Sequence, residues 1–257
     1  MLPSGNSSKG QNGQITIIGG SKLFHGAPLL ALITASRFTD MVYFTSPEPS
    51  VGDVASKIKS SLLSFIWIPW EDREEYIEKS DAVLIGSGMM RYKKEWNDGG
   101  GDETREITRD LLTKFPNKKW VIDAGSLQMV EPEWVPTGAI LTPNQKEYQR
   151  LFGDKTPAEV AKKFKCIIVR KLPVTTVCSP DKCMEIRGGN AGLTKGGTGD
   201  VQAGLTVGLL AKNDPFLAAS AASHILKKAA DHLFEKVGTV YNADDLSNEI
   251  PKLFSSK

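Results

Sequence analysis

Apolar residues along the chain fall into short β-branched runs and longer stretches in which they recur every three or four positions. The short runs predict strands at 14–19, 41–45, 63–68, 81–88, 120–123, 138–142, 166–170, 174–178 and 183–187. The longer stretches predict helices at 29–38, 103–114, 144–152, 157–164, 198–212, 215–236 and 242–254. Because strands alternate with helices, we expect an α/β protein whose mostly parallel sheet is covered on both faces.

The ends of the chain and its polar segments suggest one domain. Residues 1–13 are polar and glycine-rich and predict a flexible N-terminal tail, and residues 14–257 contain no repeat or linker that would divide them. The stretch 90–102 is polar and glycine-rich and predicts a surface loop. We therefore expect a short tail followed by a single domain.

The composition limits the classes of function. The net charge of +2 and the 24% of charged residues are ordinary globular values, and the basic residues are scattered, so we expect no nucleic-acid partner. The apolar runs are far shorter than the roughly 20 residues that span a bilayer, and the N-terminus lacks the apolar core of a secretory signal. We expect a cytoplasmic protein whose three cysteines are reduced, with a Cys178–Cys183 hairpin disulfide as the alternative.

A glycine-rich turn, Lys195–Asp200 (KGGTGD), opens the predicted helix 198–212. The unpaired N–H groups and the dipole of a helix N-terminus form an anion site. A carboxylate beside a bound phosphate is useful when it acts as a base toward the group that attacks that phosphate. Asp200 is therefore a candidate general base, although aspartate is also a favoured helix cap. Gly204 and Gly208 lie beside the apolar positions, so we expect this helix to pack closely on a neighbour.

Polar and glycine signals follow several predicted strands: Gly19-Gly20-Ser21, Gly86-Ser87-Gly88, Asp123 and Thr142-Pro143-Asn144. The carboxyl ends of parallel strands share one edge of the sheet, so we expect these signals to form one site with the Lys195–Asp200 turn. Asn144 and Glu147 share one face of a first helical turn, where they could hold a hydrated Mg²⁺ or form a capping box. Lys171, at the end of another strand, is a candidate neighbour of a nucleotide.

Five segments in this order, GGSKLFHGAP, IGSG, VIDAGSL, LTPNQKE and KGGTGD, resemble the NAD(P)H-hydrate dehydratase family of ribokinase-like proteins. The resemblance runs from about residue 14 to 250. It implies a three-layer α/β/α sandwich that restores NADH or NADPH from the ring-hydrated cofactor at the expense of a nucleotide. The GGTGD form resembles the ADP-using branch. Members are commonly fused to an epimerase domain, for which this chain has no room.

The resemblance also implies site residues, a metal and an assembly state. The hydrated cofactor is expected to meet Ala27, Gly88, Asn144 and the catalytic Asp200. The nucleotide is expected to meet Lys171, Leu172, Pro173, Val174, Thr175, Lys195, Gly196, Gly197, Thr198 and Gly199. Mg²⁺ is expected to accompany the ADP or ATP co-substrate, held by Glu147 through water, and the protein is expected to form a homo-oligomer.

Three segments of the chain depart from the family pattern. Asn144 stands where histidine is usual, Gly125 where a second aspartate is common, and Leu172-Pro173 where glycine and a small residue usually follow the lysine. The Asn-x-x-Glu pattern is the ribokinase-type signature, which keeps a kinase for a small alcohol as a rival. A non-catalytic nucleotide-binding regulator is a third hypothesis.

Overall fold

The structure is a computed structural model that describes residues 6–58, 62–91 and 100–254. Residues 1–5 of the predicted tail and residues 92–99 of the predicted loop lie outside these ranges. Within the rest of the tail, the backbone N–H groups of Gly10 and Asn12 donate to the Asp40 carboxylate at 2.8 and 3.1 Å. Residues 100–102, which were predicted as loop, are the first turn of a helix.

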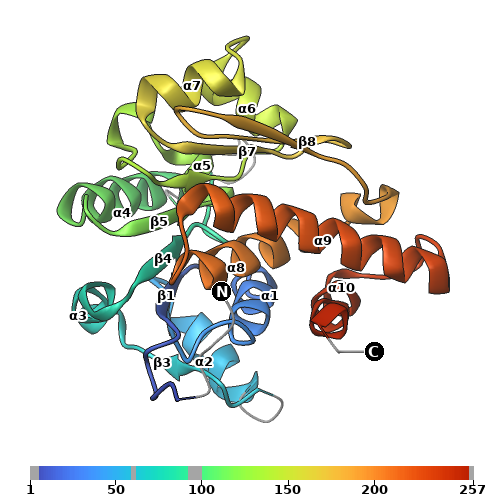
Figure 1. The fold of residues 1–257 in the computed structure, drawn as a ribbon. Coiled ribbons are helices and arrows are strands. Elements are labelled where there is room, and N and C mark those ends of the chain that lie inside the picture. The colour runs from blue at the N-terminus through green and yellow to red at the C-terminus, as the bar shows by residue number, and fades with distance from the viewer. Residues whose placement is uncertain (1–5, 59–61, 92–99, 255–257) are drawn as a thin grey trace.

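A nine-stranded sheet forms the centre of the molecule (Figure 1). Its strands are β1 (Gln14–Ile18), β2 (Met41–Thr45), β3 (Ile66–Trp67), β4 (Ala82–Ile85), β5 (Lys119–Ile122), β6 (Ile140–Leu141), β7 (Ile167–Arg170), β8 (Thr175–Cys178) and β9 (Cys183–Ile186). They lie in the order β3-β2-β1-β4-β5-β6-β7-β8-β9. All neighbours up to β7 are parallel, and β8 pairs antiparallel with both β7 and β9. The prediction of a mostly parallel α/β sheet is confirmed.

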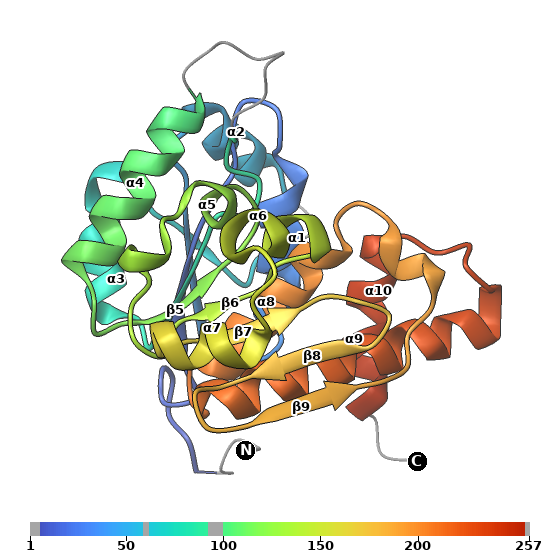
Figure 2. The ribbon, with the colours of Figure 1, turned by 90° about the horizontal axis from the view of Figure 1, so that it is seen from above.

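Helices cover both faces of this sheet. They are α1 (Gly26–Ala35), α2 (Pro49–Ile58), α3 (Arg73–Lys79), α4 (Gly100–Lys114), α5 (Ala124–Met129), α6 (Gln145–Phe152), α7 (Pro157–Phe164), α8 (Thr198–Leu210), α9 (Pro215–Val237) and α10 (Ala243–Glu249). Short 3-10 turns are η1 (Trp70–Asp72), η2 (Pro132–Trp134), η3 (Ala191–Thr194) and η4 (Ile250–Phe254). The β8–β9 hairpin lies along α9 (Figure 2).

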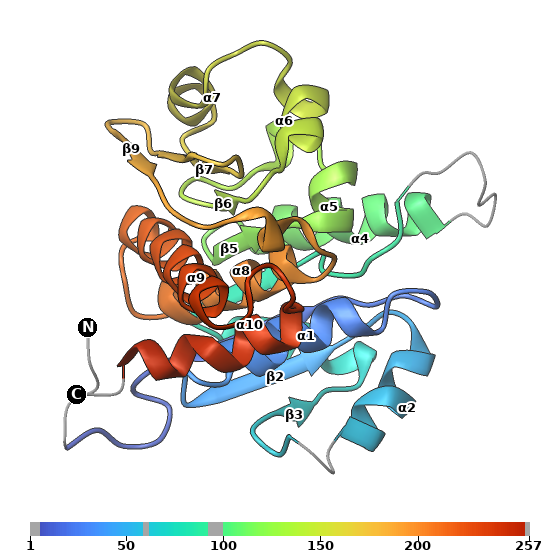
Figure 3. The same ribbon diagram turned by 90° about the vertical axis from the view of Figure 1, so that its right-hand side faces the viewer.

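Two apolar cores explain the layers, because successive side chains of a strand point to opposite faces. On β4, Leu84 joins the core beneath α1, α2, α8 and α9, whereas Val83 and Ile85 join the core beneath α3 to α7. On β5, Val121 and its neighbours divide in the same way. A third cluster joins α8 and α9 to α10 and η4, and α10 lies beside α1 and α9 (Figure 3). The expected three-layer sandwich therefore carries an additional C-terminal element on one side.

Three short helices, α2, α3 and α5, were not predicted, and β3 and β6 are each only two residues long. The expectation of three reduced cysteines is wrong for one pair. Cys178 and Cys183 are directly opposite on the β8–β9 hairpin and form a disulfide, while the buried Cys166 is free. Among the described helices, none is long and apolar enough to cross a lipid bilayer.

Candidate active site

The glycine-rich turn lies at the start of α8, which begins at Thr198. Gly197 has a φ of +90°, a left-handed conformation that favours glycine. The buried Thr198 hydroxyl lies 2.7 Å from the Leu193 carbonyl oxygen and 2.9 Å from that of Lys195, which fastens the turn to the preceding loop. The Thr198 N–H donates to the Lys195 carbonyl at 3.4 Å, and the first helical hydrogen bond runs from the Val201 N–H to the Gly197 carbonyl at 3.0 Å. The N–H groups of Gly199 and Asp200 therefore lie at the open end of the helix.

This turn separates two cavities. The larger one, of about 680 Å³, includes Thr198 and Gly199 in its lining, and the smaller one, of about 500 Å³, includes Gly196, Gly197 and Asp200. After the ligands that the resemblance implies for their lining residues, we call them the nucleotide cavity and the substrate cavity. Of the other predicted residues, Lys171, Leu172, Pro173, Thr175, Lys195 and Asn144 line the nucleotide cavity, and Ala27 and Gly88 line the substrate cavity. The strand-end signals therefore do meet at one edge of the sheet.

The walls of the substrate cavity approach one another closely. Gly88 has a φ of +73°, and a Cβ on it would lie 2.6 Å from the Phe24 carbonyl oxygen. A Cβ on Gly125 would lie 2.3 Å from the Met89 carbonyl oxygen, so the aspartate that is common at this position has no room here. His25 also lines this cavity, and its Nε2 lies 3.2 Å from the Ser50 hydroxyl. Asp123 is thus the one carboxylate of the segment 123–125.

Asp200 has the properties of a general base. Burial, together with the negative charge of Asp123, raises its pKa to about 6, and the Ser87 hydroxyl and the Lys171 ammonium partly oppose this rise. A carboxylate with a pKa of about 6 is ionised at neutral pH and accepts a proton more readily than an ordinary aspartate. The alternative that Asp200 caps the helix does not match the geometry, since Gly197 occupies the N-cap position.

A buried ion pair joins two of the strand ends. Lys171 Nζ donates to Asp123 Oδ1 at 3.1 Å, and the Thr142 hydroxyl donates to the same oxygen at 2.6 Å. Burial opposes the charge on Lys171, but the carboxylates of Asp123, Glu147 and Asp200 outweigh it and raise its pKa. A Cβ on Gly199 would lie 3.4 Å from Lys171 Nζ, so this ammonium lies against the glycine-rich turn.

Asn144 and Glu147 form the capping box of α6. Asn144 Oδ1 accepts the N–H groups of Lys146 and Glu147 at 2.9 and 3.0 Å, and Glu147 Oε2 accepts the Asn144 N–H at 2.9 Å. Glu147 Oε1 accepts from Gln128 Nε2 at 3.0 Å. Each carboxylate oxygen keeps a further lone pair, so the cap does not prevent Glu147 from accepting a metal-bound water. Asn144 lines the nucleotide cavity, although it was predicted to meet the hydrated cofactor.

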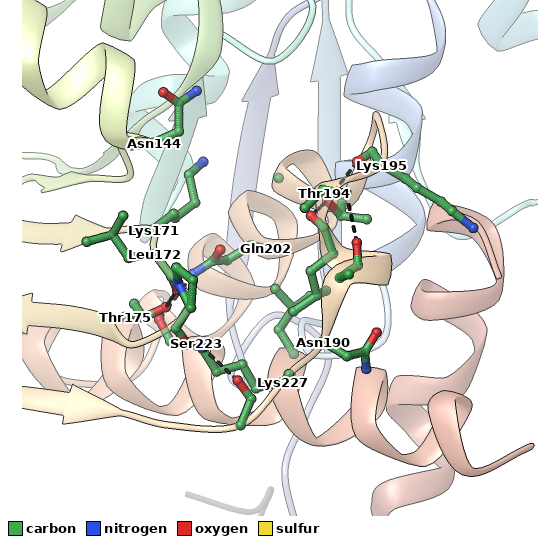
Figure 4. A pocket seen from close by; sticks show the side chains of 18 residues that line it. Asn144, Lys171, Leu172, Thr175, Asn190, Thr194, Lys195, Gln202, Ser223 and Lys227 are labelled. Carbon is green, nitrogen blue, oxygen red and sulfur yellow. Dashed lines mark hydrogen bonds between the residues drawn. The ribbon is translucent and has the colours of Figure 1, made fainter. Parts of the chain in front are cut away.

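Four of the predicted nucleotide residues differ from the expectation. Gly196 and Gly197 line the substrate cavity and not the nucleotide cavity. The Lys195 side chain extends away from Lys171 (Figure 4), and its ammonium donates to the carbonyls of Thr239 and Tyr241 at 2.6 and 2.5 Å. Val174 is not among the residues that line the nucleotide cavity, whereas its neighbours Pro173 and Thr175 are. Lys195 therefore contributes backbone to the cavity, while its charge anchors the connection between α9 and α10.

One charged residue of the nucleotide cavity was missed in the sequence. Lys227, on α9, is only 4% exposed and donates to the carbonyls of Pro173 and Gly188 at 2.6 and 2.9 Å. Pro173 lies just before β8 and Gly188 just after β9, so one ammonium fixes both segments that connect the β8–β9 hairpin to the rest of the chain. In the sequence, Lys227 is a lysine at an apolar position of an amphipathic helix, and such a lysine is easily taken for a surface residue.

The fold is that of an α/β protein of the ribokinase-like class, with a glycine-rich turn at a helix N-terminus and a carboxylate at the end of that turn. A protein from Enterococcus faecalis described as ribokinase-like superfamily has the same fold, with a TM-score of 0.79 at 22% identity. A family model described as NAD(P)H-hydrate dehydratase matches residues 15–252. The chain belongs to the NAD(P)H-hydrate dehydratase family, as the resemblance implied.

Individual relatives support this membership. The chain is 33% identical to the bifunctional NAD(P)H-hydrate repair enzyme Nnr of Methanocaldococcus jannaschii over 96% of this chain and 49% of that protein. It therefore spans about half the length of this bifunctional relative. It is 30% identical to the ADP-dependent (S)-NAD(P)H-hydrate dehydratase of Nitrosopumilus maritimus over 95% of this chain and 89% of that protein. The Bacillus subtilis ADP/ATP-dependent dehydratase, crystallised with ATP and Mg²⁺, superposes with a TM-score of 0.80 at 25% identity, covering 98% of this chain and 92% of that one.

Proposed function

We propose that this protein dehydrates the hydrated nicotinamide cofactor, NAD(P)HX, back to NAD(P)H with consumption of a nucleotide, preferably ADP. One observation carries the proposal: the Gly196–Asp200 turn is the wall between two cavities, with Gly199 on one side and Asp200 on the other. A nucleotide phosphate on the first side and a hydroxyl on the second would meet at this turn. The family relatives, named as NAD(P)H-hydrate dehydratases, support the same activity.

The first step transfers a phosphoryl group. Hydroxide is a poor leaving group, so the ring hydroxyl is first converted to a phosphate ester. Asp200 takes the hydroxyl proton, the oxygen attacks the terminal phosphorus of ADP, and the bond to the AMP oxygen breaks. The N–H groups of the turn stabilise the charge that develops on the transferred group. The ring nitrogen's lone pair then expels phosphate, and loss of the proton on the adjacent ring carbon restores the dihydronicotinamide.

The donor set fits a divalent cation that is held mainly by phosphate oxygens and water. Among the described residues, no group of three or more His, Cys, Asp or Glu side chains could hold a metal on its own. Mg²⁺ commonly keeps several waters and takes one or two carboxylates in addition to phosphate. Glu147 would hold it through water, and the ion, when bound, would neutralise charge on the phosphate oxygens.

A small-alcohol kinase is the second candidate, since the Asn144–Glu147 pair is typical of ribokinase-type proteins. A non-catalytic nucleotide-binding regulator is the third. One experiment separates them: the protein is incubated with hydrated NADH, Mg²⁺ and either ADP or ATP, and the absorbance of restored NADH is followed. We expect recovery, faster with ADP. Absence of recovery with both nucleotides would contradict the dehydratase proposal. Accumulation of a phosphorylated alcohol would favour the kinase. Nucleotide binding without turnover would favour the regulator.

We also propose that the protein acts in the cytoplasm, where its substrates are used, and that it forms a homo-oligomer. The oligomer is supported by exposed apolar side chains at the end of α9 and just beyond it, namely Phe234, Val237 and Val240, which are 50%, 48% and 82% exposed. Exposed apolar residues that gather on one region often mark an interface. Light scattering coupled to size-exclusion chromatography should give a mass that is a multiple of 28.0 kDa.

A further inference from the structure

We propose that Asp123 is a positioning residue for the phosphoryl transfer: its carboxylate holds the Lys171 ammonium at the junction of the two cavities, where the transferred group must pass. This inference rests on the proposed function. The Asp123 carboxylate itself lines neither cavity, and its action on the reaction runs through Lys171 and Asp200.

Asp123 is built into the site by contacts in three directions. It is 3% exposed and its Oδ1 accepts from the Thr142 hydroxyl at 2.6 Å and from Lys171 Nζ at 3.1 Å. Its backbone carbonyl occupies the space above Gly86, where a Cβ would lie 1.9 Å from that oxygen. The backbone of Asp123 is thus fixed against the end of β4, and its carboxylate is held by side chains that follow β6 and β7.

This rigidity matters because Lys171 is otherwise a flexible cation. The ammonium stands against Gly199, on the nucleotide side of the turn, while its partner Asp123 precedes Ala124 and Gly125 of the substrate cavity. A lysine bound to a fixed carboxylate stays at this junction when the terminal phosphate leaves the nucleotide. A lysine without that partner would follow the nucleotide phosphates and stabilise the ground state as much as the transition state.

Asp123 also acts on the base. Its negative charge is one of the causes that raise the pKa of Asp200, after burial. The other charged group acting on Asp200 is the Lys171 ammonium, which opposes this rise. His25 and Arg91 line the same cavity from α1's entry loop and from the segment after β4. Removal of the Asp123 charge should therefore make Asp200 a weaker base and move its titration to lower pH.

The test compares Asp123→Asn with the wild-type protein in the hydrated-NADH assay with ADP and Mg²⁺. Asparagine keeps the shape of the side chain and a carbonyl oxygen for Thr142 but has no charge for Lys171. We expect kcat to fall by roughly tenfold to hundredfold. The acid limb of kcat/KM should shift to lower pH, and ADP binding, measured by calorimetry, should be unchanged or tighter because a negative charge near the phosphates is lost.

The control is Asp81→Asn. Asp81 immediately precedes β4 and forms an ion pair with Lys212 at 2.8 Å, so the substitution also removes a paired carboxylate. Asp81 lines neither cavity. It should leave kcat, the pH profile and ADP binding as in the wild type. Thr142→Val is a second variant that keeps the Asp123 charge and loosens its orientation. It should lower kcat several-fold without moving the acid limb.

The proposed function and this inference fail in different ways. If the wild-type protein restores no NADH, the proposed function is wrong. If the wild-type protein is active and Asp123→Asn keeps both its kcat and its acid limb, the positioning role is wrong. Joint loss of ADP binding, melting temperature and kcat in Asp123→Asn would also overturn it, because that pattern belongs to a purely structural residue. If Asp123→Asn does not fold, an unchanged kcat in Thr142→Val overturns it.

Discussion

At the scale of single residues, Asp200 lies in a buried environment that disfavours an ionised carboxylate. Burial and a neighbouring negative charge disfavour its ionised form and raise its pKa to about 6. At pH 7 the carboxylate is ionised in both the folded and the unfolded chain, but only in the folded protein is that charge buried and therefore destabilising. Such a group is retained where it serves the reaction, and the loss of stability is the expected accompaniment of a tuned base.

The variant Asp200→Asn tests this trade-off. It should lower kcat by about a thousandfold or more, since a general base is lost, while ADP binding stays within a few-fold because the turn is retained. Its melting temperature at pH 7 should rise, because asparagine has no charge to bury. The raised pKa of Asp200 destabilises the folded state progressively as pH rises above 3.8, and in full above about 6. In the wild-type protein kcat/KM should decline as pH falls below about 6. Activity assays, calorimetry and thermal melts measure these effects.

Asp110→Asn, on the exposed face of α4, is the matched control and should change none of the three quantities. Near-normal turnover in Asp200→Asn would show that the proton leaves by another route, and the base would then have to be sought elsewhere in the substrate cavity.

Some residue positions could be predicted from the sequence and others could not. The strand-end signals identified the edge of the sheet, and Ala27, Gly88 and Asp200 do line one cavity. The sequence could not determine on which side of the turn Asn144 lies, because that depends on how β6 and β7 pair beyond their ends, where Asn144 and Lys171 form an isolated bridge. Lys227 was missed because its burial depends on carbonyls that belong to a distant hairpin.

At the scale of elements, α1 and α8 carry the site between them. α1 begins at Gly26 beside the substrate cavity, and α8 begins at the phosphate-binding turn. Their close packing depends on Gly204, where a Cβ would lie 2.2 Å from the Ala31 carbonyl oxygen. The prediction that the 198–212 helix packs closely on a neighbour is therefore confirmed, and the distance between the two helices sets the distance between the site's two walls.

The variant Gly204→Ala should push α1 and α8 apart. Overpacking against backbone costs about 1–3 kcal/mol, which corresponds to a drop in melting temperature of roughly 2–4 °C per kcal/mol for a chain of this size. Because both helices begin at the site, kcat should fall together with stability. Thermal melts and the hydrated-NADH assay on the same preparation measure the two effects.

Gly208→Ala is the matched control, one turn further along α8. A Cβ there would lie 3.2 Å from the Phe38 Cβ, a side-chain contact that can give way by a few tenths of an ångström. The gain in helix propensity of about 1 kcal/mol should offset the contact. Equal melting temperatures for the two variants would mean that α1 can move away from α8 without cost.

Elements differed in how well the sequence predicted them. All nine strands were found. β1, β2, β4, β5, β7 and β8 are apolar runs of four or five largely buried residues, which is a strong local signal, whereas β3 and β6 are only two-residue cores of the longer runs that were predicted. The helices α3 and α5 have seven and six residues, too few for a periodic pattern, and both depend on their packing against the sheet. The hairpin disulfide depends on the register of β8 against β9, which places Cys178 opposite Cys183 and is not fixed by their spacing.

At the scale of the whole molecule, the C-terminal segment closes the α8–α9 side. The Glu249 carboxylate, 2% exposed, accepts from Lys236 and Lys252 at 2.5 and 2.8 Å and lies 2.6 Å from His232 Nδ1. Burial alone would raise the pKa of Glu249, but Lys236 and Lys252 outweigh it and lower the pKa to about 2. One carboxylate thus joins α9, the end of α10 and η4, which together cover the helix that carries the phosphate-binding turn.

Glu249→Gln should therefore destabilise the folded protein at neutral pH without touching either cavity. The lysines are about half exposed and can be hydrated again, so we expect a loss of about 1–2 kcal/mol in the free energy of unfolding. Because the pKa of Glu249 is lowered, its stabilisation is complete above the ordinary value of 4.5 and is lost as pH falls toward about 2. Denaturant titrations at several pH values should show the two proteins converging over that range. The control Glu131→Gln, which removes an exposed ion pair with Arg105, should cost less than about 0.5 kcal/mol. If the difference in unfolding free energy between wild type and Glu249→Gln stays constant with pH, packing and not charge holds the C-terminal segment.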